Sequence, residues 1–522
     1  MSEKTFGKEL PEKKWDCIIV GSGMGGMTCA AMLSKLGKKV LLVEQHYVPG
    51  GYTHTFPRKN WRWDVGVHAV GEVTKHSMVG RVLSRLTDDR LQWASLGEAY
   101  DEFHFPDEFR IDFPDTPQKF RENLLHAFPE EQKAIDEYLK QVKTVAKNMR
   151  NYYLSKGLPG IFSRFLGKNA QQFFLQKTQQ VLDSLTDNKR LKTIIASQWG
   201  YYGSPPSRSS FAMQALVAKH FSYGGYYPVG GSQQIATELL QTVANSGGWT
   251  KICTGVSQII VEKKRAVGVV LEDGRKVYAP KIVSAIGAIE TVNHLLPQEM
   301  DNHAWVKSIQ TLKPSAAHVC LYLGFKGDIR QAGASPANKW FWETWDCEFE
   351  SWDFRDPRAL APVLYTSFPS LKDPQHDPGK QMFHTGEVVT FVPFAEFAKW
   401  QNERVMKRGD DYNALKEELS DRLKKQLFKY MPQLEPLVAY SELSTPVSCT
   451  HYTRAAKGAI YGIEPTPQRY ANPWLKPRTP LKNFYLSGSD VSTVGVIGAM
   501  VGGVLTALAV EPWKTMAFIR RN

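Results

Sequence analysis

Three glycines near the start of the chain have the spacing of a phosphate-binding turn. Gly21, Gly23 and Gly26 follow the apolar run Cys17–Val20, which predicts a strand, and they precede a predicted helix over residues 27–36. In this context the first glycine makes a tight turn, the second lets a pyrophosphate approach the backbone, and the third lets helix and strand pack closely. The N-terminus of the helix then offers free N–H groups and a positive dipole to the phosphates.

An acidic residue follows at the place where a dinucleotide site needs one. Residues 40–43 predict a second strand that ends in Glu44, which is placed to accept hydrogen bonds from ribose hydroxyls. Gly50 and Gly51 open another backbone approach, and Gly488-Ser-Asp490 repeats a nucleotide-type pattern near the other end of the chain. A strand, a glycine triplet, a helix, a strand and an acid in this order indicate a dinucleotide site rather than a glycine-rich turn alone.

A few other side chains could exchange protons. His54 and His68 could form an acid–base pair, or they could satisfy backbone groups in a loop. Tyr227 could donate a proton or simply pack, and Asp64 is expected to cap a loop. There is no Gly-x-Ser-x-Gly motif to support hydrolysis. The six cysteines include no Cys-x-x-Cys pair, so no disulfide framework and no metal site are expected.

The elements that must position these residues predict an α/β fold of two interleaved domains. The βαβ unit, the return of strand patterns near Tyr226 and the nucleotide-type pattern at residues 484–490 assign residues 13–75, 223–300 and 444–511 to a Rossmann-like dinucleotide-binding domain. The insertions 76–222 and 301–443 are expected to form a substrate domain with a mixed sheet and helices, and the first insertion reads as mostly helical. Further elements are expected as strands over 256–261, 266–271, 281–286, 318–323 and 387–392 and as a helix over 415–430.

Composition narrows the class of protein. The chain has 522 residues, 42% apolar and 22% charged, which excludes a collagen, a coiled coil and a mainly disordered chain. A net charge of +13 admits nucleic acid, an anionic membrane or an acidic cofactor as a partner. No nucleic-acid-binding module accompanies the charge, so no nucleic acid is expected.

Residues 140–180 carry eight basic residues and no acidic one. Aromatic and aliphatic residues are interleaved with them, including Ile161, Phe162, Phe165 and Leu166. Such a segment can lie in a membrane interface and frame a lipid entrance, or it can be a solvated face over an ordinary helical core. Both interpretations stay open.

Two segments indicate where in the cell the protein is expected to lie. The first 14 residues are charged and have no apolar core, so no secretory signal is expected. Residues 491–510 carry no charge and are long enough to cross a bilayer, but their glycines and their position after Asp490 favour a buried loop and helix. The expectation is a cytoplasmic protein with peripheral membrane association and no transmembrane helix.

Seven motifs together resemble those of the FAD-dependent amine-oxidase-like superfamily. Within it, the sequence is similar to the branch that holds phytoene desaturases, carotenoid isomerases and all-trans-retinol saturases. The resemblance covers nearly the whole chain. The motifs are Val20–Gly26, Glu44–Gly51, His54–Phe56, Trp63–His68, Tyr226–Gly231, Phe368–Pro374 and Leu486–Asp490.

The resemblance implies one non-covalent FAD. Asp490 would face its ribityl chain or pyrophosphate, and Val256 would contact its adenine. The candidate catalytic residues are His68, His54 and Tyr227. The candidate cofactor-binding residues are Gly21, Gly23, Met24, Gly25, Gly26, Glu44, Gln45, Gly50, Gly51, Tyr52, Val256, Gly488, Asp490, Val496 and Ile497.

The implied activity is the reduction or formation of carbon–carbon double bonds in an apolar polyene lipid, with an electron donor that the sequence does not identify. Hydride would be exchanged at one alkene carbon and a proton at its neighbour. Two alternatives remain: a fatty acyl desaturase of the same fold, and a flavoprotein that carries or senses lipid without turnover.

Overall fold

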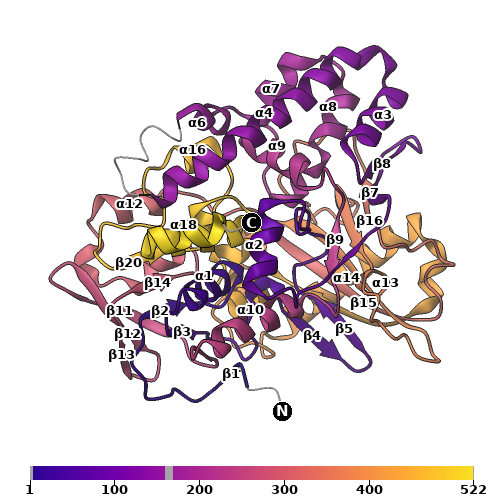
Figure 1. Cartoon of the computed structure of the whole chain (residues 1–522). Helices are drawn as coiled ribbons and strands as arrows, with labels where there is room; N and C mark the ends of the chain where they lie inside the picture. The colour runs from indigo at the N-terminus through magenta and orange to yellow at the C-terminus, as the bar shows by residue number, and fades with distance from the viewer. Residues whose placement is uncertain (1–3, 159–167, 521–522) are drawn as a thin grey trace.

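A parallel six-stranded sheet forms one side of the molecule, at the lower left of Figure 1. Each pair of neighbouring strands in it is parallel. The strands come from widely separated parts of the chain, as in a Rossmann-like fold. Their order is β1 (Phe6–Gly7), β10 (Trp249–Lys251), β3 (Val40–Val43), β2 (Cys17–Val20), β14 (Ile282–Ser284) and β20 (Phe484–Leu486). The structure is a computed structural model that describes residues 4–158 and 168–520.

Three helices pack together beside this sheet: α1 (Met24–Lys35), α10 (Gln233–Asn245) and α17 (Gly495–Val510). The helix α1 begins three residues earlier than the sequence predicts, because Gly25 belongs to its first turn. A Cβ atom at Gly25 would lie 2.4 Å from the Cα of Gly488. The absent side chain therefore lets the helix start inside the glycine loop and approach the β20–α17 connection.

A three-stranded antiparallel sheet is attached to the first sheet, with strands β11 (Val256–Glu262), β12 (Arg265–Leu271) and β13 (Lys276–Tyr278). The sequence predicts the first two of these strands to within a residue. A short hairpin of β4 (Thr55–Arg58) and β5 (Trp61–Asp64) leads from the glycine-rich region toward the second half of the molecule. Trp61 and Trp63 anchor the hairpin by donating to the carbonyls of Phe325 and Leu323.

The second half of the molecule is built on a mixed seven-stranded sheet. Its strands, in order, are β19 (Val438–Ser444), β15 (Ala317–Lys326), β18 (Phe383–Val392), β17 (Val363–Ser367), β16 (Asn338–Trp342), β7 (Ala99–His104) and β8 (Arg110–Pro114). The long helix α14 (Asp410–Tyr430) packs on its outer side, with Leu419, Leu423 and Leu427 in a shared core.

The mostly helical interpretation of residues 76–222 is wrong for β7 and β8. Asp101 and Glu102 interrupt the apolar pattern of β7 and hide the strand. Both carboxyls are buried in the sheet, where Asp101 accepts from Asn338 Nδ2 at 2.8 Å and Glu102 pairs with Lys339 at 2.6 Å. Tertiary partners from β16, which lies more than 200 residues away in the chain, thus decide the secondary structure here.

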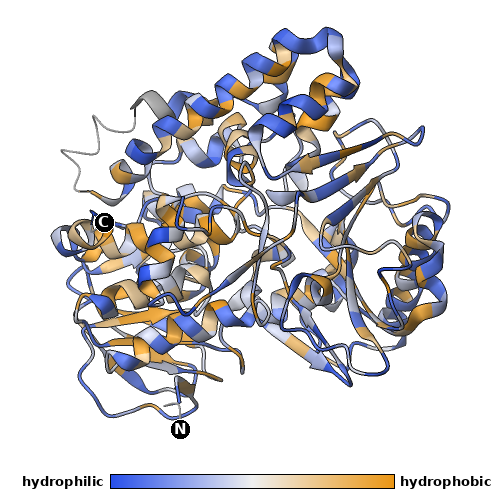
Figure 2. Cartoon of the chain, turned by 45° about the vertical axis from the view of Figure 1, so that its right-hand side comes forward, coloured by the Kyte–Doolittle hydropathy of each residue, from blue (hydrophilic) through white to orange (hydrophobic). Residues whose placement is uncertain are grey.

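Apart from the short strand β6 (Trp93–Ser95), the other regular elements described in the first insertion are helices, as expected. The insertion contains α3 (Pro117–Ala127), α4 (Gln132–Gly157), α6 (Lys168–Leu175), α7 (Thr178–Leu185), α8 (Lys189–Ala196) and α9 (Phe211–His220), at the top of Figure 1. Apolar and polar residues alternate along these helices in Figure 2, and α4 buries an apolar stripe that includes Ile135, Tyr138, Val142, Val145 and Met149. The domain bounds themselves stay a prediction.

The described residues include no helix that is long and apolar enough to cross a membrane. Residues 495–510 of the uncharged segment form α17, most of which is buried. In the basic segment, Tyr152 and Phe174 are buried and stack with ring centroids 4.4 Å apart, so these two aromatics belong to the helical core. Ile161, Phe162, Phe165 and Leu166 lie outside the described residues.

Candidate active site

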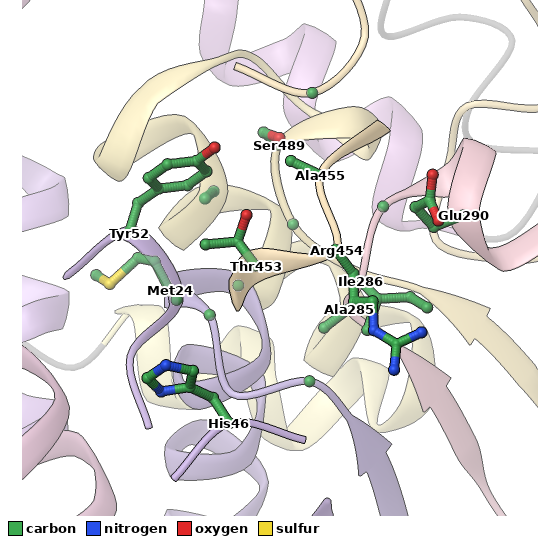
Figure 3. A pocket seen from close by; sticks show the side chains of 18 of the residues that line it. Met24, His46, Tyr52, Ala285, Ile286, Glu290, Thr453, Arg454, Ala455 and Ser489 are labelled. Atoms are coloured by element: carbon green, nitrogen blue, oxygen red, sulfur yellow. The ribbon is translucent and has the colours of Figure 1, made fainter. Parts of the chain in front are cut away.

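A cavity of about 340 Å³ lies where the glycine loop, the β3–β4 connection and the β20–α17 connection meet. Figure 3 shows Met24, His46 and Tyr52 on one side and Ile286, Glu290 and Arg454 on the other. Thirteen of the fifteen candidate cofactor-binding residues line it: Gly21, Gly23, Met24, Gly25, Glu44, Gln45, Gly50, Gly51, Tyr52, Val256, Gly488, Asp490 and Val496. We call it the dinucleotide cavity.

The glycine triplet leaves open space at Gly23, where a pyrophosphate would lie, and packs closely at Gly26. A Cβ atom at Gly23 would meet nothing within 4 Å, so it would project into the open cavity. A Cβ atom at Gly26 would lie 2.1 Å from the carbonyl oxygen of Gly21. Gly26 therefore serves the packing of α1 on β2 and is not among the cavity-lining residues, whereas Gly23 keeps the cradle open. The residues present fit FAD.

Glu44 fixes the loop around this cradle. Its carboxylate accepts from the Ser22 backbone N–H at 2.9 Å, from the Ser22 hydroxyl at 2.7 Å and from the His46 backbone N–H at 2.8 Å. An ionised carboxylate has about four acceptor positions, so one remains for a ribose hydroxyl. Glu44 thus stabilises the loop in addition to its predicted hydrogen bond with ribose.

Asp490 joins two loops at the edge of the cavity. One carboxylate oxygen accepts from the Ala288 N–H at 2.7 Å, and the other accepts from the Ile463 N–H at 3.1 Å. The residue lines the cavity, but both oxygens already hold backbone groups. Its contact with a ribityl chain or pyrophosphate stays a prediction.

A second cavity, of about 380 Å³, has largely apolar walls. It lies between α2 (Met78–Leu86), α4, α9, α17 and α18 (Pro512–Arg520). Ile497, a candidate cofactor-binding residue, lines this second cavity and not the dinucleotide cavity. The apolar walls are Val79, Val82, Ala146, Met149, Leu154, Met213, Leu216, Val217, Ile497, Met500, Val501, Val504, Leu505, Leu508, Met516 and Ile519.

The two cavities share a junction, which consists of Gly66, His68, Tyr461, Gly495 and Val496. The N-terminus of α17 lies at this junction, where its free N–H groups favour negative charge. Of the five residues, His68 has the side chain whose ordinary pKa is nearest to neutral.

The imidazole of His68 contacts a buried carboxyl. His68 Nδ1 lies 2.7 Å from Glu387 Oε2 on β18, although neither atom makes a hydrogen bond of regular geometry in the described part of the chain. Burial raises the pKa of Glu387 to about 8, although the Asp64 backbone N–H and Lys372 oppose the rise. Burial and the Lys372 ammonium lower the pKa of His68 to about 3. At neutral pH the ring is therefore neutral and the carboxyl holds the proton.

A buried lysine fixes the loop that carries His68. Lys372, at the end of α13 (Pro369–Lys372), donates to the His68 carbonyl at 2.7 Å, to the Ser367 hydroxyl at 2.7 Å and to the Asn338 side-chain oxygen. Burial lowers the pKa of Lys372 to about 8, against the attraction of Glu387.

Tyr227 and Asp64 are linked to Glu387 by hydrogen bonds. The Tyr227 hydroxyl donates to Asp64 Oδ2 at 2.5 Å, and the Ser232 N–H donates to the other oxygen at 3.2 Å. The Asp64 N–H in turn donates to Glu387 Oε1 at 2.8 Å. Tyr227 is not among the residues that line either cavity, so the structure does not bring its phenol to the junction.

His54 lies in the dinucleotide cavity but not at the junction. Its Nδ1 is 2.6 Å from the Gly51 carbonyl oxygen, and burial lowers its pKa to about 4. This geometry agrees with the simpler of the two interpretations, in which the ring satisfies a backbone group in the loop.

Sequence reasoning missed Glu387 and Lys372 as parts of the site. Glu387 begins a segment for which the sequence predicts only a strand. Lys372 lies in the Phe368–Pro374 motif, for which the sequence predicts no role in the site. The available signal was the single carboxyl at the start of the mostly apolar segment 387–392, since a charge that is buried requires a partner.

Comparison with known proteins shows the family to which the chain belongs. A family model described as flavin containing amine oxidoreductase matches residues 24–510. The all-trans-retinol 13,14-reductase of Danio rerio is 30% identical over 516 residues, which cover 94% of this chain and 84% of that protein. The chloroplastic prolycopene isomerase 2 of an Oncidium hybrid cultivar is 24% identical over 525 residues, with 96% and 84% covered.

Solved structures show the same fold. A crystal structure of an oxidoreductase from Methanosarcina mazei superposes with a TM-score of 0.64 at 17% identity, covering 93% of this chain and 98% of that one. This likeness and the parallel sheet confirm the predicted α/β fold with a Rossmann-like domain, and the match to a flavin-containing family confirms FAD as the cofactor. The chain belongs to the family of flavin containing amine oxidoreductases and is an FAD-dependent oxidoreductase.

Proposed function

We propose that this oxidoreductase reduces or forms a carbon–carbon double bond in an apolar polyene lipid of the retinoid or carotenoid type. The observation that carries the proposal is the apolar second cavity, which meets the dinucleotide cavity at His68. Its volume is within the usual range for small-molecule sites, about 300–1,000 Å³. The named activities of the two relatives, on all-trans-retinol and on prolycopene, support the same class of substrate.

Each part of the site has a defined task in such a reaction. FAD, when bound, supplies or takes up hydride. The walls of the second cavity hold the polyene by apolar burial and exclude water. His68 exchanges the proton at the neighbouring carbon through Nε2, which has no partner among the described residues. The side chain is 14% exposed, and since Nδ1 is buried against Glu387, Nε2 is the nitrogen left for the junction.

An anaerobic single-turnover experiment tests the proposal. FAD-loaded protein is reduced and mixed with all-trans-retinol, a carotenoid or an unsaturated fatty acyl ester, while the flavin absorbance and the products are followed. The proposal expects rapid flavin reoxidation by a polyene, together with a product that has gained two hydrogen atoms, or the reverse reaction with oxidised flavin. Reaction with only the acyl ester would support the acyl desaturase alternative. Binding of lipid with no change in flavin would support a carrier or sensor.

We also propose that the chain docks on an anionic membrane at the opening of the second cavity. Three exposed residues line this opening: Met78 on α2, Arg150 on α4 and Arg520 on α18. Trp513 is 81% exposed on α18 and lies one turn from Met516, which lines the cavity. A tryptophan beside basic residues is typical of a membrane interface, and a polyene would need a route from the bilayer. Helices α2 and α18 lie next to each other (Figure 1). The Arg85 side chain on α2 donates to the Phe518 carbonyl of α18 at 2.8 Å.

A further inference from the structure

The carboxyl of Glu387 is the one acidic group in contact with the His68 side chain in the described residues. It lies on β18, opposite Tyr322 of β15 and Ser367 of β17, and its side chain is completely buried. Solvent therefore reaches the His68–Glu387 pair only from the junction of the two cavities, through the exposed part of the His68 ring.

We propose that Glu387 supplies, through His68, the proton that is exchanged with the substrate, and that Lys372 stabilises the carboxylate left behind. This inference rests on the proposed function. For saturation, the Nε2–H bond of His68 breaks as a C–H bond forms on the substrate, and Nδ1 takes the proton from Glu387 Oε2. The imidazole changes tautomer but stays neutral, and one carboxyl becomes a carboxylate. For desaturation, the same proton moves in the opposite direction. The bound flavin takes up or gives the two electrons.

The surroundings of Glu387 suit a group that changes its charge. The Asp64 N–H at 2.8 Å stabilises the carboxylate, and Lys372 attracts it electrostatically. The pKa values agree with this role, since that of Glu387 is raised to about 8 while that of His68 is lowered to about 3. The titratable or charged groups that face the pair are Asp64, Tyr227, His318, Cys320, Tyr322, Tyr365 and Lys372, with Asp101 acting on Lys372.

If Glu387 supplies the proton, the reaction rate should depend on pH. Whether the rate falls or rises with pH would show whether the protein saturates or desaturates its substrate. Saturation requires the protonated carboxyl, so its rate should fall as the pH rises through about 8. Desaturation requires the carboxylate, so its rate should rise through the same pH. Lys372 also titrates near pH 8, and the experiment must therefore identify the carboxyl itself.

The test compares Glu387→Gln with Glu387→Asp and with the matched control Glu102→Gln. Glu102 is another buried carboxyl of the same sheet, but it pairs with Lys339 and not with His68. Infrared difference spectra between pH 6 and pH 9 follow the C=O band of a protonated carboxyl, which an ammonium group lacks. FAD binding and thermal unfolding establish that each variant is folded.

We expect the wild type and Glu102→Gln to show a carboxyl band that disappears as the pH rises through about 8. We expect Glu387→Gln to lack this band. We also expect the Glu387→Gln rate to fall by roughly 100-fold or more, the scale of general acid–base catalysis, with no remaining pH dependence near 8. The rate of Glu387→Asp should lie between the two.

Two outcomes would overturn the proposal. One is an unchanged pH profile in a folded Glu387→Gln protein. The other is a Glu387 band that does not titrate between pH 6 and pH 9. The infrared result is independent of turnover, so it stands even if no polyene reacts, in which case the proposed function fails separately.

Discussion

The two cavities that meet at His68 are built by different means. Backbone atoms and small residues shape the dinucleotide cavity, in which glycines make up much of the wall around the phosphate cradle. Aliphatic side chains from five helices shape the second cavity. A cavity shaped by backbone recognises a cofactor of fixed form, whereas one shaped by side chains can change its specificity through single substitutions. The difference predicts that the two sites can be damaged separately.

The largest effect is expected from Gly23→Val. Its branched side chain would project into the open space at the glycine loop, where nothing lies within 4 Å of a Cβ atom, and would occupy the place of the pyrophosphate. FAD binding, measured by flavin fluorescence, should be abolished while the protein stays folded. Gly23→Ala, as a graded control, should bind FAD more weakly than the wild type. Equal FAD affinity in Gly23→Val and the wild type would mean that the triplet is only a turn.

The converse experiment fills the second cavity. Ala146→Trp on α4 places a large ring among the apolar walls and should lower kcat/KM for a polyene by about tenfold or more, since one extra methylene alone changes discrimination by roughly 10–200-fold. The affinity for FAD should not change. Lys147→Trp is the matched control, because Lys147 is the next residue on the same helix and is exposed. Similar activity in both variants would place the substrate elsewhere.

A smaller effect on the first cavity is expected from Glu44→Ala. The loss of a charge-assisted hydrogen bond to ribose should weaken FAD binding by about 1.5–3 kcal/mol. Because Glu44 also holds Ser22 and His46, part of the loss comes from a loosened loop. Calorimetric titration with FAD measures the total, and Glu44→Gln, which keeps the acceptor, should lose less. Wild-type affinity in both variants would remove Glu44 from the site.

The smallest effect concerns the opening of the second cavity. Trp513→Ser should weaken binding to anionic vesicles several-fold, with salt reducing the binding that remains, because basic residues near such a surface contribute about 1 kcal/mol each and are screened. Activity on detergent-dispersed polyene should not change. Tyr278→Ser, at an exposed aromatic on β13, is the control. Vesicle binding equal to that of the wild type would mean that α18 does not face the membrane.

The contrast between a cavity shaped by backbone and one shaped by side chains also explains which parts of the site the sequence could predict. The βαβ unit is local, within about thirty residues, and its glycines have meaning through the backbone alone, so the strands β2 and β3 agree with the prediction residue for residue. The start of α1 was placed three residues late, because the packing of Gly25 against Gly488 involves a segment more than 450 residues away.

The proposed catalytic cluster of His68, Glu387 and Lys372 is not local. Glu387 reaches His68 across more than 300 residues of chain, and its burial depends on how β18 pairs with β15 and β17. The sequence predicted the strand over 387–392 but had no means of showing which side chain faces the junction. His68 could be proposed from its residue type, whereas Tyr227 was proposed on the same grounds and instead supports Asp64.

The most direct test of the central claim is an experimental structure of the FAD-loaded protein with a bound polyene. We predict that the flavin ring and a double bond of the polyene meet beside His68, Tyr461 and Val496, with His68 Nδ1 still in contact with Glu387. A polyene bound away from the second cavity, or a flavin ring that does not reach this junction, would contradict it.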